Sequence, residues 1–397
     1  MKRVFVTFLT ITCVVITSCE KDNDSFRGKS NVVMATAKSG DVMIHLAGSG
    51  TISIDWGDRK GIITYSLLEY NDGEWDPLSK ESKYAFIHNY SNDNSRIISI
   101  TGENITHLFC GYNFLSSLDV NRNTALTYLD CSGNLLLSSL DVSDNSALTI
   151  LYCGDNSLKN LDLSHNIPLR HLICRRNVLT SLEVDKNILL DSLECEYNQL
   201  TSLDLSNNTA LTYLSCNSNA FTRLDVSKNI ALAELYCYGN QLTSLDVSYN
   251  TGLKILFSGG SSNKISSLDL SNNAALLWLA CLGNPLTGLD LSKNTELTRL
   301  DCEECQLTSL DVSNNTALTT LQCQDNQLTN LDVSHNPIIE SINCGNNQLS
   351  GEALNALFET LPERRGSVIS IYNNPGTSSC DPYIAINRGW GVSGISF

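Results

Sequence analysis

Residues 211–221, LTYLSCNSNAF, and residues 307–315, LTSLDVSNN, show the two halves of a motif that recurs along most of this chain. The first half reads Leu-x-x-Leu-x-Cys-x-x-Asn-x-Leu and the second Leu-x-x-Leu-Asp-Val-Ser-x-Asn, with a period of about 21 residues between Ile105 and Gln348. A unit this short cannot bury its apolar residues alone. The period therefore predicts a solenoid whose successive coils stack on one another.

Apolar and polar residues alternate in both halves of the motif. This alternation predicts two short parallel strands per coil, one on each flank, with the Leu, Cys and Val side chains pointing inward. At about 4.8 Å per strand spacing, the coils should form a rod or shallow arc on the order of 50 Å long. Twelve coils are expected, starting at residues 105, 126, 148, 169, 190, 211, 232, 253, 276, 297, 318 and 339.

The Leu-x-x-Leu-x-Cys-x-x-Asn-x-Leu half resembles the highly conserved segment of leucine-rich repeats, with Cys in a slot usually filled by Leu. The resemblance covers about 245 residues, and it implies a mainly β, right-handed solenoid with parallel strands. Since the family is used mostly for protein recognition, it also implies a binding function, as in internalin-like adhesins.

Eleven of the fifteen cysteines occupy one repeat position, which we call the cysteine ladder. Side chains of in-register parallel neighbours point the same way, which suits neither disulfide geometry nor tetrahedral metal ligation. We therefore predict inert, buried thiols, with disulfides or metal ligation as the alternatives. The ladder comprises Cys110, Cys131, Cys153, Cys174, Cys195, Cys216, Cys237, Cys281, Cys302, Cys323 and Cys344.

An asparagine follows most ladder cysteines by three residues and is predicted to bond backbone groups of its own and the neighbouring coil. Cys305 fills this slot in one coil and is expected to be structural rather than reactive. The asparagine ladder comprises Asn113, Asn134, Asn156, Asn177, Asn198, Asn219, Asn240, Asn263, Asn284, Asn326 and Asn347.

The N-terminus is typical of a targeting segment, because Lys2 and Arg3 precede an apolar run that leads to Cys19. Residues 16–19 resemble the lipobox of bacterial lipoproteins, which implies a signal peptide over residues 1–18 and a lipid anchor at Cys19. An ordinary secretory signal is the alternative, and a run this short disfavours a membrane-spanning anchor. Residues 20–24, EKDND, resemble an acidic tag that implies an outer-membrane lipoprotein of Gram-negative bacteria, displayed on the extracellular side.

Different patterns flank the repeats. Residues 19–31 are expected to be a flexible tether, and residues 32–103 alternate in a way that predicts a small antiparallel β-sandwich. Its Ile54-Asp55-Trp56-Gly57-Asp58 stretch resembles a PKD-type β-domain, where Asp55 and Asp58 are expected to stabilise a turn, with calcium ligation as the alternative.

The solenoid is assigned to residues 104–350. Residues 351–397 are expected to form an α/β cap, with a helix over residues 351–361, a last strand over residues 367–372 and a short helix before Trp390.

A second ladder is acidic and explains most of the net charge of −16. Adjacent carboxylates should repel one another, by up to about 1 kcal/mol per pair in water-like surroundings. Hydrogen bonds from the hydroxyl of the serine two residues on are the expected compensation at most of these positions, with shared divalent cations as the alternative. The acidic ladder comprises Asp119, Asp141, Asp162, Glu183, Asp204, Asp225, Asp246, Asp269, Asp290, Asp311 and Asp332.

The two outward faces differ in how much they vary from coil to coil. The second-half positions are almost uniform, whereas the first-half positions vary and carry aromatic and charged residues. Varied aromatic positions on a rigid sheet favour a recognition surface over neutral drift. We predict a ligand-binding face formed by Tyr128, Tyr152, Tyr213, Glu234, Tyr236, Tyr238, Phe257, Trp278 and Arg299, centred on residues 213–278. Phe109 and His107 occupy the same outward positions in the first coil.

These features together predict a non-enzymatic binding protein without a cofactor or metal. Neither a nucleophile motif, nor a phosphate loop, nor a metal-spaced histidine pair occurs in the sequence. The acidic charge argues against nucleic acid as a partner. A protein on a host or bacterial surface is the first expectation for the partner. A glycan captured for nutrient uptake and a purely structural spacer role are the alternatives.

Overall fold

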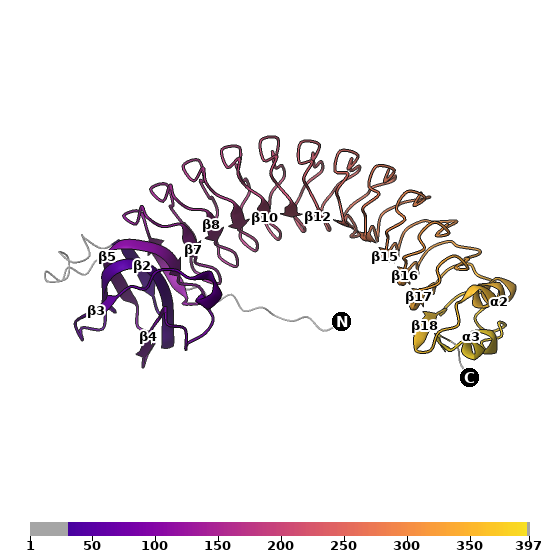
Figure 1. Cartoon of the computed structure of the whole chain (residues 1–397), viewed down its shortest axis with the longest axis horizontal. Helices are drawn as coiled ribbons and strands as arrows, with labels where there is room; N and C mark the ends of the chain where they lie inside the picture. Colours follow the sequence, from indigo (N-terminus) through magenta and orange to yellow (C-terminus); the bar gives the residue numbers. More distant parts are fainter. Residues whose placement is uncertain (1–30, 395–397) are drawn as a thin grey trace, which may run out of the picture.

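The computed structural model describes residues 31–394, which form an arc-shaped solenoid with an N-terminal β-domain at one end (Figure 1). The fold is mainly β, a parallel-strand solenoid of about 14 turns with few helices. The predicted fold class is therefore confirmed.

Each repeat contributes one three-residue strand, and these strands line the inner, concave side of the arc (Figure 1). Neighbouring strands pair in parallel and in register, so that Leu214 lies beside Leu235 and Leu235 beside Leu256. The strands are β7 (Tyr128–Asp130), β8 (Ile150–Tyr152), β9 (His171–Ile173), β10 (Ser192–Glu194), β11 (Tyr213–Ser215), β12 (Glu234–Tyr236), β13 (Ile255–Phe257), β14 (Trp278–Ala280), β15 (Arg299–Asp301), β16 (Thr320–Gln322) and β17 (Ser341–Asn343).

The prediction of a second strand in every coil was wrong. The second halves run as extended segments without strand pairing, except for β6 (Leu115–Asp119) in the first coil. The coils fan out toward the outer, convex side (Figure 1), where backbones diverge too far to keep a continuous ladder of hydrogen bonds. Side-chain alternation survives there because Leu and Val still point into the core.

Before the solenoid, antiparallel strands build the N-terminal domain and continue directly into the repeat sheet. Strand β5 (Arg96–Phe109) pairs antiparallel with β1 (Val32–Thr36) and β2 (Gly40–Asp55), and its end pairs in parallel with β7. It therefore crosses the expected domain boundary between residues 103 and 104. The remaining elements are β3 (Ile62–Ser66), the 3-10 helix η1 (Asp72–Glu74) and β4 (Ala85–Tyr90).

Asp55 and Asp58 stabilise the turn after β2, as predicted. Asp55 accepts a hydrogen bond from the backbone N–H of Gly57 over 2.9 Å, and Asp58 accepts one from that of Lys60 over 3.0 Å. Each hydrogen bond closes a short turn and gives one backbone N–H group an acceptor.

Helix α2 (Gly351–Thr360) follows the last repeat and agrees with the predicted helix. Strand β18 (Ser367–Ser370) continues the parallel sheet beyond β17, as expected, but it is not the last strand. Helix α3 (Tyr383–Asn387) leads into β19 (Trp390–Ser393), which pairs in parallel with β18. The sheet thus extends by two more strands past the repeats.

The cysteine ladder lies in the core, as predicted. All eleven thiols are free and fully buried. Burial raises the pKa of ten ladder thiols above their usual value, to about 12 at Cys237 and Cys344, and the interaction with Cys305 followed by burial raises that of Cys281. The thiols therefore pack as small apolar side chains.

Asparagines hold both flanks of the coils together. The predicted asparagine ladder bonds to backbone carbonyls of adjacent coils, as Asn177 does to Cys153 and Cys174. A second ladder, which the sequence analysis did not assign, does the same on the convex side, where Asn229 donates to the carbonyls of Leu205 and Asn208. This second ladder replaces the missing strand pairing with side-chain hydrogen bonds.

Within residues 31–394, no helix is long and apolar enough to cross a membrane. The same residues contain no group of three or more His, Cys, Asp or Glu side chains arranged to hold a metal ion.

Candidate recognition face

The candidate site is the concave sheet, where the first and third residues of each strand face outward and the middle residue faces the core. This pattern gives Tyr213 and Tyr236 half-buried side chains, while Leu214 and Leu235 are fully buried. Because the strands are in register, outward residues of successive coils stand in columns. Neighbouring side chains in these columns can therefore contact one another across coils.

Four rings form an unbroken series across β11 to β14. The ring centroids of Tyr213 and Tyr236 are 5.5 Å apart, those of Tyr236 and Phe257 4.9 Å, and those of Phe257 and Trp278 4.7 Å. The last two pairs meet edge to face, the geometry that aromatic quadrupoles favour. Together with Arg299, these residues are called the aromatic strip.

Arg299 ends the strip on β15. Its guanidinium carbon lies 4.5 Å from the centre of the Trp278 ring, and its Nε lies 2.9 Å from a carboxylate oxygen of Asp301. Trp278 Nε1 donates to the same carboxylate over 2.8 Å. Asp301 is only 5% exposed, so one buried carboxylate fixes both outward side chains. Side chains held in this way lose little rotamer freedom on binding.

Glu234 and Tyr238 flank the strip at β12. The Tyr236 hydroxyl donates to Glu234 over 2.8 Å, and burial followed by this hydrogen bond raises the pKa of Tyr236. Tyr238, one residue after Cys237, is more exposed, and its backbone N–H donates to Asn217 of the preceding coil. The structure thus places seven of the nine predicted face residues, Arg299 included, on or beside the adjacent strands β11 to β15.

Tyr128 and Tyr152 belong to a separate aromatic group at the N-terminal end of the sheet. Tyr128 stacks on His107, which in turn stacks on Tyr70 of the N-terminal domain with centroids 3.8 Å apart. Trp75, beside η1, contacts the edges of His107 and Tyr128. Burial lowers the pKa of His107 to about 4, so the ring is neutral near pH 7.

Sequence analysis missed Tyr70 and Trp75, although aromatic residues in an otherwise polar loop were an available signal. Phe109 occupies the outward column beside Asp130, as predicted, but it is not exposed. Its side chain is 2% exposed because the N-terminal domain covers the first coil, where Phe109 packs against His45.

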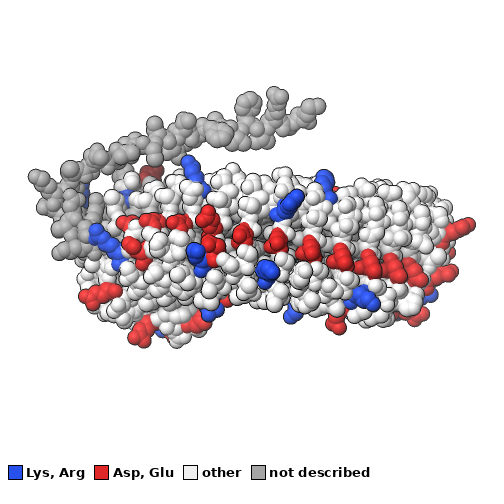
Figure 2. Space-filling model, turned by 90° about the horizontal axis from the view of Figure 1, so that it is seen from above, with Lys and Arg blue, Asp and Glu red and all other residues white. Residues whose placement is uncertain are grey.

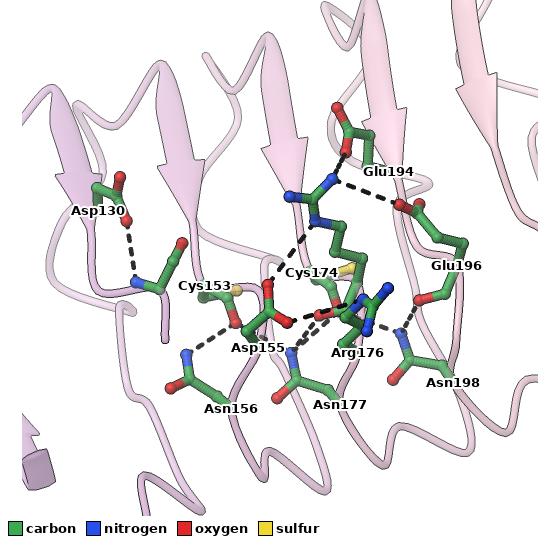
Figure 3. A network of polar contacts seen from close by, with 12 residues as sticks. Asp130, Cys153, Asp155, Asn156, Cys174, Arg176, Asn177, Glu194, Glu196 and Asn198 are labelled. Atoms are coloured by element: carbon green, nitrogen blue, oxygen red, sulfur yellow. Dashed lines mark hydrogen bonds and ion pairs between the residues drawn. The ribbon is translucent and has the colours of Figure 1, made fainter. Parts of the chain in front are cut away.

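An ionic network lies between the coil of Tyr152 and the coil of Tyr213, and Figure 3 shows its contacts from close by. Arg175 pairs with Glu194 over 3.0 Å, with Glu196 over 3.7 Å and with Asp155 over 3.9 Å. Burial, with the neighbouring Glu196 adding to it, raises the pKa of Glu194. The Arg176 guanidinium also lies 3.8 Å from Asp155, so three carboxylates here face two guanidinium groups, and this part of the face is charged rather than aromatic.

The acidic ladder runs as a row along the convex face, which Figure 2 shows from outside the arc. The backbone N–H of Ser206 donates to Asp204 over 2.9 Å, and the same contact recurs at the other serine-followed aspartates. Hydrogen bonds from the backbone N–H and hydroxyl of that serine lower the pKa of Asp204. The prediction named the serine hydroxyl as the donor. The hydroxyl of Ser143 does donate to Asp141 over 2.7 Å, but the donor that recurs from coil to coil is the serine backbone N–H, which the prediction did not include.

No family profile matches the chain, and no curated protein matches it in sequence. Solved structures of leucine-rich-repeat proteins do resemble it.

The functional domain of InlJ from Listeria monocytogenes, described as including a cysteine ladder, is 35% identical with a TM-score of 0.57. That match covers 67% of this chain and 64% of that one, so the chain spans less than two thirds of the InlJ structure. An internalin from the same organism is 21% identical with a TM-score of 0.68, covering 74% of this chain and 87% of its own. A leucine-rich-repeat protein of Leptospira interrogans is 20% identical with a TM-score of 0.54, covering 69% and 85%.

These likenesses show the leucine-rich-repeat fold. Proteins of this kind generally bind other proteins and are generally non-enzymatic.

Proposed function

We propose that this chain is a non-enzymatic binding protein that recognises a surface protein of a host or of another bacterium through its concave face. The observation that carries the proposal is the aromatic strip, in which Tyr213, Tyr236, Phe257 and Trp278 contact one another in series. Tyr and Trp offer a large contact area at small entropic cost, and they are enriched where binding energy is concentrated.

The contrast between the two faces supports the same proposal. The convex face repeats one aspartate–serine hydrogen bond from coil to coil, which a structural role explains. The concave face changes from aromatic to charged and back to aromatic within a few coils. Such variation gives a surface the chemical individuality that selective recognition needs.

Binding of the full chain to target cells, measured with the triple variant Tyr213→Ala, Tyr236→Ala and Trp278→Ala, tests the proposal. We expect binding to fall at least tenfold, since aromatic hot-spot residues each contribute on the order of 2 kcal/mol. Tyr249→Ala is the matched control, because Tyr249 is 59% exposed and lies in the second half of its coil. Unchanged binding by the triple variant, with a native circular-dichroism spectrum, would place recognition elsewhere.

Glycan capture is the second candidate, favoured by the half-buried, accessible rings of Tyr213 and Trp278. Such rings can stack on the apolar faces of sugars. Pretreating the target cells with protease or with glycosidases separates the two candidates. Binding abolished by protease alone supports a protein partner, whereas binding to a glycan array that Trp278→Ala abolishes supports a saccharide.

We further propose that the chain is an outer-membrane lipoprotein exposed to the extracellular side, anchored through Cys19. Cys19 and the residues that resemble a lipobox lie outside the described residues, so the sequence carries this proposal. Metabolic labelling with a lipid precursor should label the full chain and not Cys19→Ala. Loss of surface proteolysis in intact cells expressing Cys19→Ala would support display on the outer side.

A further inference from the structure

Cys305 differs from the other cysteines of the repeats. It stands where the asparagine ladder has Asn284 in the preceding coil and Asn326 in the following one. Asn326 donates to the carbonyls of Cys302 and Cys323, and the Cys305 thiol copies one such bond by donating to the carbonyl of Cys281 over 3.6 Å. The sulfur therefore sits between two coils, facing the end of β14.

This position brings two thiols of adjacent coils close together. The Cys281 and Cys305 thiols interact strongly enough to shift each other's pKa in opposite directions, and the Cys305 sulfur lies 3.6 Å from the Cys281 carbonyl oxygen. Cys281 lies directly beside Cys302 in the parallel register, so those two side chains point the same way and cannot bridge. Cys305 instead lies in the turn of the following coil, from which its sulfur reaches the backbone of Cys281.

The surroundings of Cys305 also favour its thiolate. The interaction with Cys281, aided by the backbone N–H groups of Asn284 and Gly283, lowers the pKa of the Cys305 thiol against the effect of burial. All eleven ladder thiols have raised pKa values instead. Cys305 is 7% exposed, while Cys281 is fully buried, so a reagent reaches Cys305 first.

We propose that Cys281 and Cys305 are a redox pair that closes to a disulfide between the coils that carry Trp278 and Arg299. The Cys305 thiolate attacks one sulfur of an external disulfide, forms a mixed disulfide and releases one thiolate. The Cys281 thiol then gives its proton to a released thiolate and attacks the Cys305 sulfur, displacing the second thiolate. Overall, two protein thiols and one external disulfide become one protein disulfide and two external thiols.

The link would join the coil of β14 to that of β15. Cys281 directly follows β14, and Cys305 lies four residues after Asp301, which holds Trp278 and Arg299 together. A covalent bond at this point would fix the spacing of the two coils at the C-terminal end of the aromatic strip. The proposal does not depend on the partner of that strip.

The test uses the reduced full chain, incubated with oxidised glutathione, quenched with acid, alkylated and digested with trypsin and a glutamate-specific protease. Cleavage after Glu303 and Glu304 separates Cys302 from Cys305. Cys305 and Cys323 share the peptide that ends at Glu340, so fragmentation of that peptide in the mass spectrometer assigns the linked residue. We expect one linked pair, Cys281 with Cys305. A pair involving Cys302, or mixed disulfides spread evenly over the ladder, overturns the proposal.

Two variants sharpen the result. Cys305→Asn restores the residue found in the neighbouring coils, so it should keep the native circular-dichroism spectrum and form no link. Cys281→Ser removes the second thiol, so a glutathione mixed disulfide should accumulate on Cys305 at least about ten times faster than on any ladder cysteine. An unmodified Cys305 in this variant, or a native wild type that stays fully reduced, contradicts the pair.

Discussion

The side chain of Asn240 reaches back one coil and donates a hydrogen bond to the backbone carbonyl of Cys216 over 3.1 Å. Its Nδ2 also donates to Cys237 of its own coil, and its Oδ1 accepts from the backbone N–H of Phe221. One buried amide thus satisfies three backbone groups that belong to two coils. Stacking in this solenoid is therefore directional as well as hydrophobic.

Asn240→Ala should destabilise the coils on both sides of it. Each buried backbone group left unpaired costs roughly 1–3 kcal/mol, so we expect a total loss of about 3 kcal/mol once water partly replaces the amide. Urea denaturation and hydrogen exchange of residues 211–253 measure the effect. The exposed Thr243→Ala in the same coil is the control and should change stability by less than about 0.5 kcal/mol.

The ladder thiols should be unreactive in the folded protein. Burial raises the pKa of Cys216 far above its usual value, so the nucleophilic thiolate is scarcely populated at pH 8. Titration with a chromogenic disulfide reagent should be slow for the ladder without denaturant and complete in guanidinium chloride. Rapid reaction at many ladder positions in native protein would contradict the buried packing.

The repeat period carried most of the information about the fold. Leucine, cysteine and asparagine recur at fixed positions, because each must meet its counterpart in the next coil, and this predicted the parallel core strands such as β11 and β12. The lack of a second strand could not be predicted from alternation. Leu245 and Val247 point inward whether or not their backbones pair, and pairing depends on the curvature of the arc.

The repeat register predicted that outward side chains of successive coils stand in columns. It did not predict which of these side chains contact one another. Sequence placed Tyr236, Phe257 and Trp278 on one face, and the structure adds that they touch in series. The burial of Phe109 and the stacking of Tyr70 on His107 depend on how the N-terminal domain folds back over the first coil. No local pattern encodes that long-range contact.

Acid should destabilise the convex face. Nine aspartates of the acidic ladder have pKa values lowered from 3.8 by hydrogen bonds from the serine two residues on. A carboxyl whose folded pKa lies below its unfolded pKa stabilises the fold above the unfolded value, and this contribution is lost as pH falls through the folded value. We therefore expect the melting temperature to fall as pH decreases below about 4.

Aspartate-to-asparagine variants separate charge from hydrogen bonding on this face. Asp246→Asn with Asp269→Asn keeps an oxygen acceptor for the backbone N–H groups of Ser248 and Ser271 but cannot ionise. The acid-induced loss should shrink, and like-charge repulsion at neutral pH should be relieved. Adding a chelator to the unmodified protein should leave its melting temperature unchanged at neutral pH. A melting temperature that falls on adding the chelator would instead support divalent cations shared between carboxylates of the acidic ladder.

Asp301 should control the order of the aromatic strip. Asp301→Ala removes the acceptor of Trp278 Nε1 and the partner of Arg299, each a hydrogen bond with a charged group worth about 1.5–3 kcal/mol. We expect a changed tryptophan emission spectrum and weaker binding to target cells. Gln322→Ala is the control, because Gln322 occupies the same column in the next coil. Equal effects of both changes would argue against a specific role for Asp301.

Gly48 in β2 packs tightly against the backbone of β5. A Cβ atom added at Gly48 would lie 1.9 Å from the backbone oxygen of Asn104, where neither strand can yield without losing pairing. Gly48→Ala should therefore separate the two strands and destabilise the N-terminal domain by more than about 3 kcal/mol, as overpacking against backbone does. Gly252→Ala is the matched control, because its added Cβ meets no atom within 4 Å. Hydrogen exchange across residues 40–55 and 96–109 should rise in the first variant and stay unchanged in the second.

Because β5 continues into the repeat sheet beside β7, protection from exchange in Gly48→Ala should also fall in the first coils of the solenoid. Normal protection there would mean that the solenoid folds independently of the domain that covers its end.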